Sequence, residues 1–383
     1  MTPTLGVALV CIALLNSDER AKDGPDPYEL ERARAAVVRA AVESVAPSIV
    51  MIETIGGAQP VVEGGPGRIL EESFRLADGP STGLIWSSDG YILSSSFNFA
   101  RDPSIITVTL HDGRRMVAKL LGRDHIRRIA LLKVDADGLK PAEWSGRAEL
   151  RVGQYGIACG RALGGERPSI SLGIISALGR RNGNAVQTDA KISPMNYGGP
   201  LLDIDGRVIG LIVPMAGLGG ALAGAEWNDS GIGFAILRDR IEFVFDRLAA
   251  GESIEPGKIG VALEEDEPSL FPFLDNLLPQ SKGVRIKEVA RRSPASRAKL
   301  KAGDKIVALD GQPTGDMPEL QRRLSDRAAG ESVRLTIKRR WRSMDVKLTL
   351  ARASDIGKPL KAESTEARES STGDDTTTQP VAD

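Results

Sequence analysis

The stretch that decides the fold is residues 83–134, GLIWSSDGYILSSSFNFARDPSIITVTLHDGRRMVAKLLGRDHIRRIALLKV. Its apolar residues form short runs, which are separated by turn signals at Ser88-Asp89-Gly90 and Asp112-Gly113. An Asp-Gly pair between alternating apolar residues is a strong local signal for a β-hairpin. Residues 83–134 therefore predict antiparallel strands joined by tight turns.

The same pattern continues to about Val244, with another turn signal at Asp205-Gly206. Many short strands at this spacing are typical of an antiparallel barrel or sandwich. A helix is predicted before them over Tyr28–Ala46 and another after them over Leu237–Ala250, closed by Gly251. The predicted strands are Ser48–Ile52, Gly83–Trp86, Tyr91–Ser94, Ile105–Leu110, Val117–Leu121, Ala130–Val134, Ile170–Ser176, Val208–Val213 and Ile232–Ile236.

A second domain follows a polar linker that contains Pro256 and Gly257. From Ala353 onward the chain is rich in Glu, Ser, Thr and Asp, so this tail is expected to be disordered. The second domain mixes predicted strands near 260–263, 283–288, 305–309, 333–338 and 345–350 with predicted helices near 293–298 and 318–327. The expected domains are an N-terminal segment (1–24), a first domain (25–252), a linker (253–258), a second domain (259–352) and the acidic Ser/Thr-rich tail (353–383).

The N-terminal segment contains an apolar run of 11 residues, LGVALVCIALL, at Leu5–Leu15. A membrane-spanning helix needs about 20 apolar residues, whereas the core of a signal peptide is shorter. Residues 1–24 are therefore expected to be a signal peptide or a short N-terminal anchor, which predicts export to the periplasm or cell envelope. A misplaced start codon is the alternative.

Composition excludes several function classes. Lys and Arg number 50 against 51 for Asp and Glu, so overall charge does not favour a nucleic-acid partner. The basic cluster Lys338–Arg342 is interpreted as solvated charge at a hairpin turn, with contact to an anionic surface as the alternative. Membrane association is expected only through the N-terminal segment. The two cysteines, Cys11 and Cys159, match neither a disulfide framework nor a metal site, and no cofactor is predicted.

Two sets of segments carry a family resemblance: residues 83–134, 150–153, 173–180, 187–190, 198–201 and 231–236 in the first domain, and 259–261, 293–295, 300–306 and 310–311 in the second. In order and spacing they resemble the HtrA/Deg family of trypsin-like serine proteases with a C-terminal PDZ domain. The resemblance implies a mainly β protein, with a trypsin-like double β-barrel followed by an α+β PDZ domain. It also implies a homo-oligomer, a trimer formed through the N-terminal part of the protease domain.

The resemblance assigns a residue in this chain to each position of the catalytic triad. The family's histidine follows Tyr-Ile-Leu in a Thr-Asn-Asn-His run, which places Phe97 there. Its aspartate precedes Leu-Ala-Val-Leu-Lys, which places Arg128 there, and its serine lies in Gly-Asn-Ser-Gly-Gly-Pro, which places Tyr197 there. Acyl transfer needs a nucleophilic hydroxyl, an imidazole base and a carboxylate that orients the base. All three triad positions are therefore replaced, and no catalytic residue is predicted.

What the resemblance leaves at this site is the remnant of the oxyanion loop, Asn196, Gly198 and Gly199. The histidines, His111 and His125, are interpreted as surface or loop residues. Because Arg128 needs a partner, we expect its guanidinium to lie over the ring of Phe97 or Tyr197 and to fill the old cleft, with an outward-facing Arg128 as the alternative.

In the PDZ domain the resemblance places the carboxylate-binding loop at Ile259-Gly260-Val261. Leu320 and Leu324 are expected on the opposite groove wall, with plain core packing as the alternative. The expected function is an inactive protease-PDZ protein that binds peptide C-termini or unfolded segments in a chaperone-like or scaffold role. The alternatives are an active serine endopeptidase with a non-standard site and a regulatory subunit in mixed oligomers with active relatives.

Overall fold

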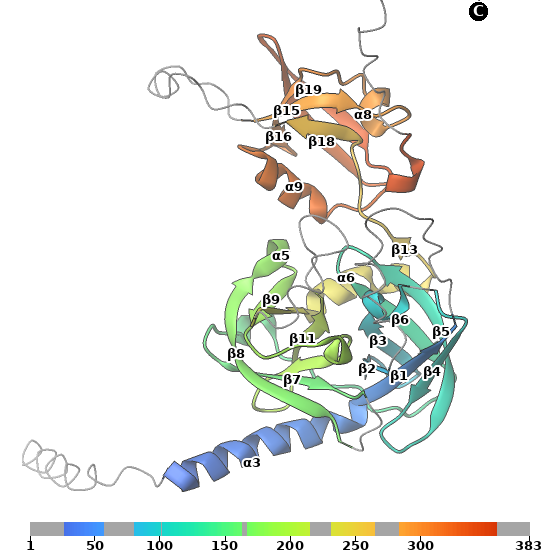
Figure 1. Cartoon of the computed structure of the whole chain (residues 1–383), viewed down its shortest axis with the longest axis vertical. Coiled ribbons are helices and arrows are strands. Elements are labelled where there is room, and N and C mark those ends of the chain that lie inside the picture. The colour runs from blue at the N-terminus through green and yellow to red at the C-terminus, as the bar shows by residue number, and fades with distance from the viewer. Residues whose placement is uncertain are drawn as a thin grey trace, which may run out of the picture. The chain divides into compact units, whose positions relative to one another are not determined.

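The computed structural model describes residues 27–56, 80–100, 102–162, 167–214, 231–264 and 283–357 (Figure 1). The chain divides into two compact units, between Glu255 and Pro256. This division lies within the predicted linker 253–258. Ser253–Ile254 nevertheless form strand β13, which pairs in parallel with β5 of the first unit, so these two residues belong to that unit.

The first barrel of the first unit is closed by backbone pairing. Its order is β5-β4-β1-β2-β3-β6, and β6 pairs back onto β5. Its core holds the fully buried side chains of Phe99, Ile52 and Leu132. The strands are β1 (Ile49–Ile55), β2 (Ser81–Ile85), β3 (Tyr91–Ser95), β4 (Ile105–Thr109), β5 (Arg115–Asp124) and β6 (Ile129–Val134).

The second barrel is closed in the order β10-β11-β12-β9-β8-β7. Its core includes Ile175, Leu201 and Tyr197. The long strand β8 extends beyond the predicted 170–176, and β9 and β10 are strands where the sequence predicted only family motifs. The strands are β7 (Tyr155–Gly160), β8 (Ser169–Gly179), β9 (Ala185–Thr188), β10 (Pro200–Leu202), β11 (Val208–Val213) and β12 (Gly233–Ile236).

Two main helices flank the barrels, as the sequence predicts. The first, α3 (Pro27–Val45), leads through a 3-10 turn, η1 (Ala46–Ser48), directly into β1. The second, α6 (Arg238–Ala249), buries Ile241, Val244 and Leu248. Gly251 follows it with φ +88°, a conformation that favours glycine at a helix end. A single helical turn, α5 (Arg180–Gly183), joins β8 to β9.

The second unit is a mixed α+β domain built on one antiparallel sheet. The sheet order is β14-β15-β16-β18-β19, so β14 is an edge strand. Leu320 of α9 is completely buried in its core with residues of these strands. The elements are β14 (Val261–Glu264), β15 (Val284–Val289), α8 (Pro294–Arg297), β16 (Lys305–Leu309), β17 (Gln312–Pro313), α9 (Met317–Ser325), β18 (Ser332–Arg339) and β19 (Arg342–Thr349).

These elements confirm the predicted fold class, a double β-barrel followed by an α+β domain. The predicted N-terminal segment 1–24 lies outside the described residues, as does the tail from residue 358 onward. The first residues of the tail differ from the prediction, because Ala353–Asp355 form a 3-10 turn, η6.

Candidate functional site

The first barrel supplies Phe97 and Arg128 from neighbouring backbone segments. Phe97 lies in a 3-10 turn, η2 (Ser96–Phe99), that directly follows β3, and the Ser95 hydroxyl accepts a hydrogen bond from the Phe97 N–H. Arg128 directly precedes β6, and its carbonyl accepts from the Ser96 N–H at 3.0 Å. Because β3 pairs with β6, these two positions lie side by side although they are 31 positions apart in the sequence.

The second barrel supplies Tyr197, which is buried, with 4% of its surface exposed. It follows a 3-10 turn, η4 (Pro194–Asn196), and precedes β10. Its ring meets the ring of Phe97 edge to face, with 5.5 Å between centroids and 81° between planes. The structure therefore brings the proposed base and nucleophile positions together, but both carry aromatic rings.

Burial controls the chemistry of the Tyr197 phenol. Desolvation raises its pKa to about 12, so the phenol is protonated at neutral pH. A nucleophilic hydroxyl needs an adjacent base to remove its proton. The ring of Phe97, which contacts the phenol ring, has no group that accepts a proton.

Arg128 takes a backbone conformation that is unusual for a residue with a side chain, with φ +64°. Its side chain is half-buried, and its Nε has no hydrogen-bond partner among the described residues. Burial lowers its pKa below the usual arginine value. The predicted cation–π contact with Phe97 or Tyr197 is not found in the described part of the chain, where such contacts involve Arg34, Arg127, Lys133 and Arg238 instead. The aromatic pair is present without its expected cation.

The loop that carries Tyr197 uses its own N–H groups internally. The Asn196 N–H donates to Ser193 O at 2.9 Å, and the Tyr197 N–H donates to Pro194 O at 3.2 Å. The next two N–H groups, of Gly198 and Gly199, donate to Ile212 O and Asn196 O at 2.9 and 2.8 Å. An oxyanion hole needs N–H groups that point at the developing charge of the substrate. Four consecutive N–H groups are thus engaged within the protein.

Asn196 holds this closed loop with its side chain. Its Oδ1 accepts from both the N–H and the hydroxyl of Ser193, at 3.2 and 3.0 Å, which forms a capping box around η4. Asn196 is therefore a structural residue of the 3-10 turn, and it keeps the Tyr197 N–H directed at Pro194.

Gly198 and Gly199 are required by close packing. A Cβ on Gly198, which has φ +89°, would lie 2.2 Å from Thr82 O, and one on Gly199 would lie 2.2 Å from Cys159 O. Strand β2 of one barrel and strand β7 of the other therefore approach the loop too closely for any side chain. The two glycines set the position of Tyr197 between the barrels.

A residue that the sequence did not single out, Asn98, also joins the barrels. Its Nδ2 donates to Tyr197 O at 3.0 Å and to Ser94 Oγ at 3.1 Å, and both contacts are buried. The Ser94 hydroxyl in turn donates to Thr82 O. Asn98 directly follows Phe97, but Tyr197 lies 99 positions further along the chain, so the sequence alone does not reveal the contact.

Neither histidine contacts Tyr197 within the described residues. His125 Nε2 lies 3.2 Å from a Glu255 carboxylate oxygen, beside β13. His111 is exposed in the β4–β5 turn. No imidazole therefore replaces the base at this site in the described ranges.

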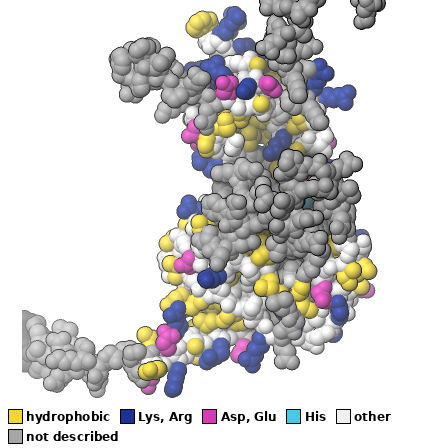
Figure 2. Space-filling view, in the orientation of Figure 1, with side chains coloured by type: hydrophobic (Ala, Val, Ile, Leu, Met, Phe, Trp, Pro, Cys, Tyr) yellow, Lys and Arg dark blue, Asp and Glu magenta, His cyan; other side chains and the backbone are white. Residues whose placement is uncertain are grey.

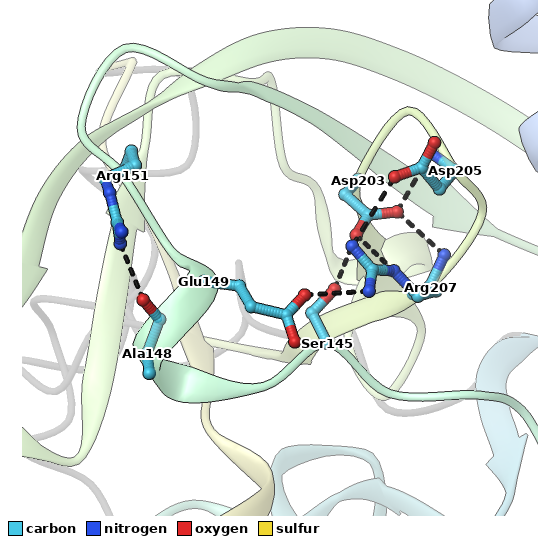
Figure 3. Close-up of polar contacts among 7 residues, drawn as sticks. All are labelled: Ser145, Ala148, Glu149, Arg151, Asp203, Asp205 and Arg207. Carbon is cyan, nitrogen blue, oxygen red and sulfur yellow. Dashed lines mark hydrogen bonds and ion pairs between the residues drawn. The ribbon is translucent and has the colours of Figure 1, made fainter.

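A separate cluster of polar residues lies in the second barrel (Figure 3). The Ser145 hydroxyl donates to the buried Asp203 carboxylate at 2.5 Å, and Arg207 contacts both Asp203 and Glu149. A hydroxyl that donates to a carboxylate without an imidazole between them is not a triad. This cluster fastens the β10–β11 hairpin to the segment before β7, and its role is structural.

In the second unit the predicted carboxylate-binding loop is rigidly held. The carbonyls of Ile259 and Gly260 accept from the N–H groups of Ala295 and Ala290, both at 3.0 Å. Gly260 has φ +81°, and a Cβ there would lie 2.3 Å from Ser293 Cβ. The Ile259 side chain is buried in the core, so only the backbone of the loop and the half-buried Val261 remain for a ligand.

The two leucines predicted on the groove wall differ in burial. Leu320 is fully buried in the domain core, which is inconsistent with direct peptide contact in this structure. Leu324 is half-buried and packs against the edge of the same core. Leu320 therefore matches the alternative of plain core packing, whereas the groove-wall position of Leu324 stays a prediction.

No helix within the described ranges is both long and apolar enough to cross a membrane. In the same residues, no group of three or more His, Cys, Asp or Glu side chains is placed to hold a metal ion.

Comparison with known proteins matches both units. The family described as "Trypsin-like peptidase domain" matches residues 81–211, and that described as "PDZ domain" matches residues 285–339. The serine protease HhoA of Synechocystis sp. is 30% identical over 379 residues, which cover 89% of this chain and 92% of HhoA.

A DegP-like periplasmic serine endoprotease of Chlamydia muridarum is 33% identical over 276 residues, 70% of this chain. The match covers 53% of that relative, so the chain spans about half of its length. Among solved structures, the HtrA-type protease AlgW with a tripeptide matches with a TM-score of 0.60 and 26% identity, over 81% of this chain and 95% of AlgW.

Proposed function

Because this chain belongs to the HtrA/Deg family of trypsin-like serine proteases with a PDZ domain, we propose that it is a catalytically inactive member that binds peptides. The observation that carries this proposal is the Phe97–Tyr197 ring contact, 5.5 Å between centroids, at the positions that the family resemblance assigns to base and nucleophile. A pair of aromatic rings cannot exchange a proton in the way that a serine and a histidine do.

Three features support inactivity together. Burial raises the pKa of the Tyr197 phenol to about 12, so this hydroxyl gives up its proton less readily than a solvated phenol. Arg128 puts a cation where the resemblance expects a carboxylate, and the N–H groups of the loop are engaged internally. Triad residues act as a unit, and loss of the nucleophile and base leaves only weak residual catalysis.

The PDZ domain supports the binding role. Strand β14 is at the edge of its sheet, where an extended peptide can add as a further strand. The Gly260 loop directly precedes β14, so a peptide carboxylate bound there would leave the peptide chain running along the strand. The proposed ligands are peptide C-termini or unfolded protein segments, and the proposed role is that of a chaperone or scaffold in the cell envelope.

Relatives add support on location and ligand class. The Chlamydia relative is named periplasmic, which agrees with the export predicted for this chain, and AlgW is named with a bound tripeptide. By family resemblance we also propose a homo-oligomer, a trimer, formed through the first unit.

The decisive experiment treats the purified full chain with a fluorophosphonate probe and measures casein digestion in parallel, with trypsin as the positive control. We expect no labelled residue and no digestion above buffer. A labelled serine, identified by mass spectrometry, would contradict the proposal and support an active protease with a non-standard site. Digestion that depends on an added active relative would instead support a regulatory subunit.

A further inference from the structure

The hairpin of β18 and β19 carries an unusual tip. The two strands pair over eight residues each, from Ser332↔Thr349 to Arg339↔Arg342, and only Arg340 and Trp341 form the turn. Arg340 has φ +55°. Two-residue hairpin turns favour Asn and Gly in such conformations, so neither turn residue is explained by the needs of the turn.

Trp341 is 96% exposed, the most exposed of the large hydrophobic side chains described. Tryptophan is a large apolar residue that is highly buried on average. In the described residues its ring has no aromatic or cation–π contact. Folding of the domain therefore does not account for this side chain.

Five cationic residues lie on the hairpin near its tip or next to its base. Lys338, Arg340 and Arg342 lie on the hairpin within three positions of Trp341. Lys299 and Lys301 adjoin the same end, because Arg339 donates to Lys299 O and Asp304 accepts from the Lys301 N–H. Figure 2 shows Lys and Arg side chains gathered around a hydrophobic group at one end of this domain.

The nearby acid does not neutralise this group. Asp304 is bound by Arg339 through two hydrogen bonds, Nε to Oδ1 at 2.6 Å and Nη2 to Oδ2 at 2.7 Å. The other five cations form no ion pair within the described part of the chain. The Asp304–Arg339 pair fixes the base of the hairpin, so Trp341 and its neighbours Arg340 and Arg342 stand at the tip on a fixed support.

We propose that this tip is a docking surface for an anionic phospholipid bilayer. Tryptophan is enriched at the membrane–water interface, where its apolar ring and its N–H each find a suitable environment. Basic residues near an anionic bilayer each contribute an attraction of about 1 kcal/mol. A convex tip with one aromatic ring suits a bilayer better than a nucleic acid, because single-stranded nucleic acids stack on successive aromatic residues along a basic groove.

This surface departs from the interpretation of Lys338–Arg342 as solvated charge and from the expectation that the N-terminal segment alone contacts a membrane. The exposure of Trp341 is the observation that changes the interpretation. The proposal is independent of whether the trypsin-like unit is active.

The test is co-sedimentation of the full chain with vesicles of phosphatidylcholine alone or with about 30% phosphatidylglycerol. We expect binding to the anionic vesicles and a loss of at least about tenfold in affinity for Arg340→Glu/Arg342→Glu and for Trp341→Ser. The matched controls are Lys347→Glu, on the same hairpin but away from its tip, and Phe243→Ser, a 68% exposed aromatic residue of the first unit. All variants keep the N-terminal segment.

Quenching of tryptophan fluorescence by brominated lipid provides a second measurement. It should occur in the wild-type protein and be lost in Trp341→Phe, which keeps an aromatic ring at the tip. Equal binding by wild-type and tip variants would overturn the proposal and assign any membrane contact to another segment. Binding to DNA oligonucleotides with no binding to anionic vesicles would overturn it in favour of a nucleic-acid partner.

Discussion

Phe97 and Tyr197 join the two barrels through their rings, which meet edge to face with 81° between planes. Phe97 belongs to the turn after β3 of the first barrel, and Tyr197 precedes β10 of the second. Asn98 also donates a hydrogen bond to the Tyr197 carbonyl, so a ring contact and a hydrogen bond both join the turn after β3 to Tyr197. The positions that the family resemblance assigns to catalysis form an apolar contact between the barrels in this chain.

The first prediction concerns the energy of that contact. Phe97→Ala and Tyr197→Ala should each destabilise the first unit, with Tyr197→Ala costing about 3 to 5 kcal/mol because its side chain is buried. A double-mutant cycle in urea unfolding should show a coupling of about 0.5 to 1.5 kcal/mol between the two rings. Additive effects of the two substitutions would mean that the rings do not stabilise each other.

The second prediction concerns restoration of activity. Phe97→His, Arg128→Asp and Tyr197→Ser together restore the side chains of a triad, but the N–H of residue 197 would still be bound to Pro194 O. Loss of one oxyanion donor costs about a hundredfold to a thousandfold in kcat. We therefore expect the triple variant to digest casein close to background, and each double variant to be no better.

Adding Asn196→Gly to the triple variant should release the turn, because the Asn196 side chain closes the capping box with Ser193. Casein digestion should then rise above that of the triple variant. Strong activity in the triple variant alone would show that the loop opens without this change.

The third prediction concerns the PDZ loop. A peptide with a free, apolar C-terminus should bind, and its amidated form should bind at least about tenfold more weakly, because a carboxylate gains charge-assisted hydrogen bonds from backbone N–H groups. Gly260→Ala should abolish binding, since its Cβ would lie 2.3 Å from Ser293 Cβ at φ +81°. Gly315→Ala, where the nearest atom is 3.8 Å away, is the control. Equal affinity of the wild-type domain for both peptides would rule out this loop as a carboxylate site.

The fourth prediction uses the raised pKa of Tyr197. The unfolded chain loses this phenolic proton near the usual pKa of 10, whereas the folded chain keeps it to about 12. The contribution of this group to stability is therefore fully present below pH 10 and is lost as the pH rises toward 12. In an absorbance titration, wild type should form one more phenolate than Tyr197→Phe, and this phenolate should appear near pH 12 or when the protein unfolds. A difference centred at pH 10 in folded protein would show that Tyr197 is solvated.

The fifth prediction concerns the base of the β18–β19 hairpin. Although burial acts in the opposite direction, hydrogen bonds from Arg339 and Lys301 hold the pKa of Asp304 below its usual value. The contribution of Asp304 to the stability of the second unit should therefore be present above about pH 4 and be lost as the pH falls through the pKa of Asp304 in the folded protein.

Asp304→Asn should lower the stability of the second unit by about 2 to 3 kcal/mol at pH 7, as expected for loss of hydrogen bonds to a charged group. In urea unfolding the difference from wild type should shrink as the pH is lowered to 3. The exposed Asp345 provides a control through Asp345→Asn, which should change stability little. A difference that is constant with pH would contradict the assigned ion pair.

Local sequence was sufficient for the larger elements. Alternating apolar residues with Asp-Gly turns predicted β3 to β6, and the amphipathic pattern before Pro47 predicted α3 to within one residue at each end. These features depend on neighbours within a few positions. Short strands such as β9 and β10 were missed as strands because their pairing partners lie elsewhere in the barrel.

The sequence by itself determined the two domains and the family resemblance, which assigns Phe97, Arg128 and Tyr197 to the triad positions, because motifs and residue types are local properties. Only the tertiary structure decided how these residues are used. It brought the Phe97 and Tyr197 rings together, buried Leu320 and exposed Trp341, and it gave Arg128 no cation–π contact in the described part of the chain. Burial and contact depend on residues distant in the chain that close each barrel and sheet, so no local pattern could reveal them.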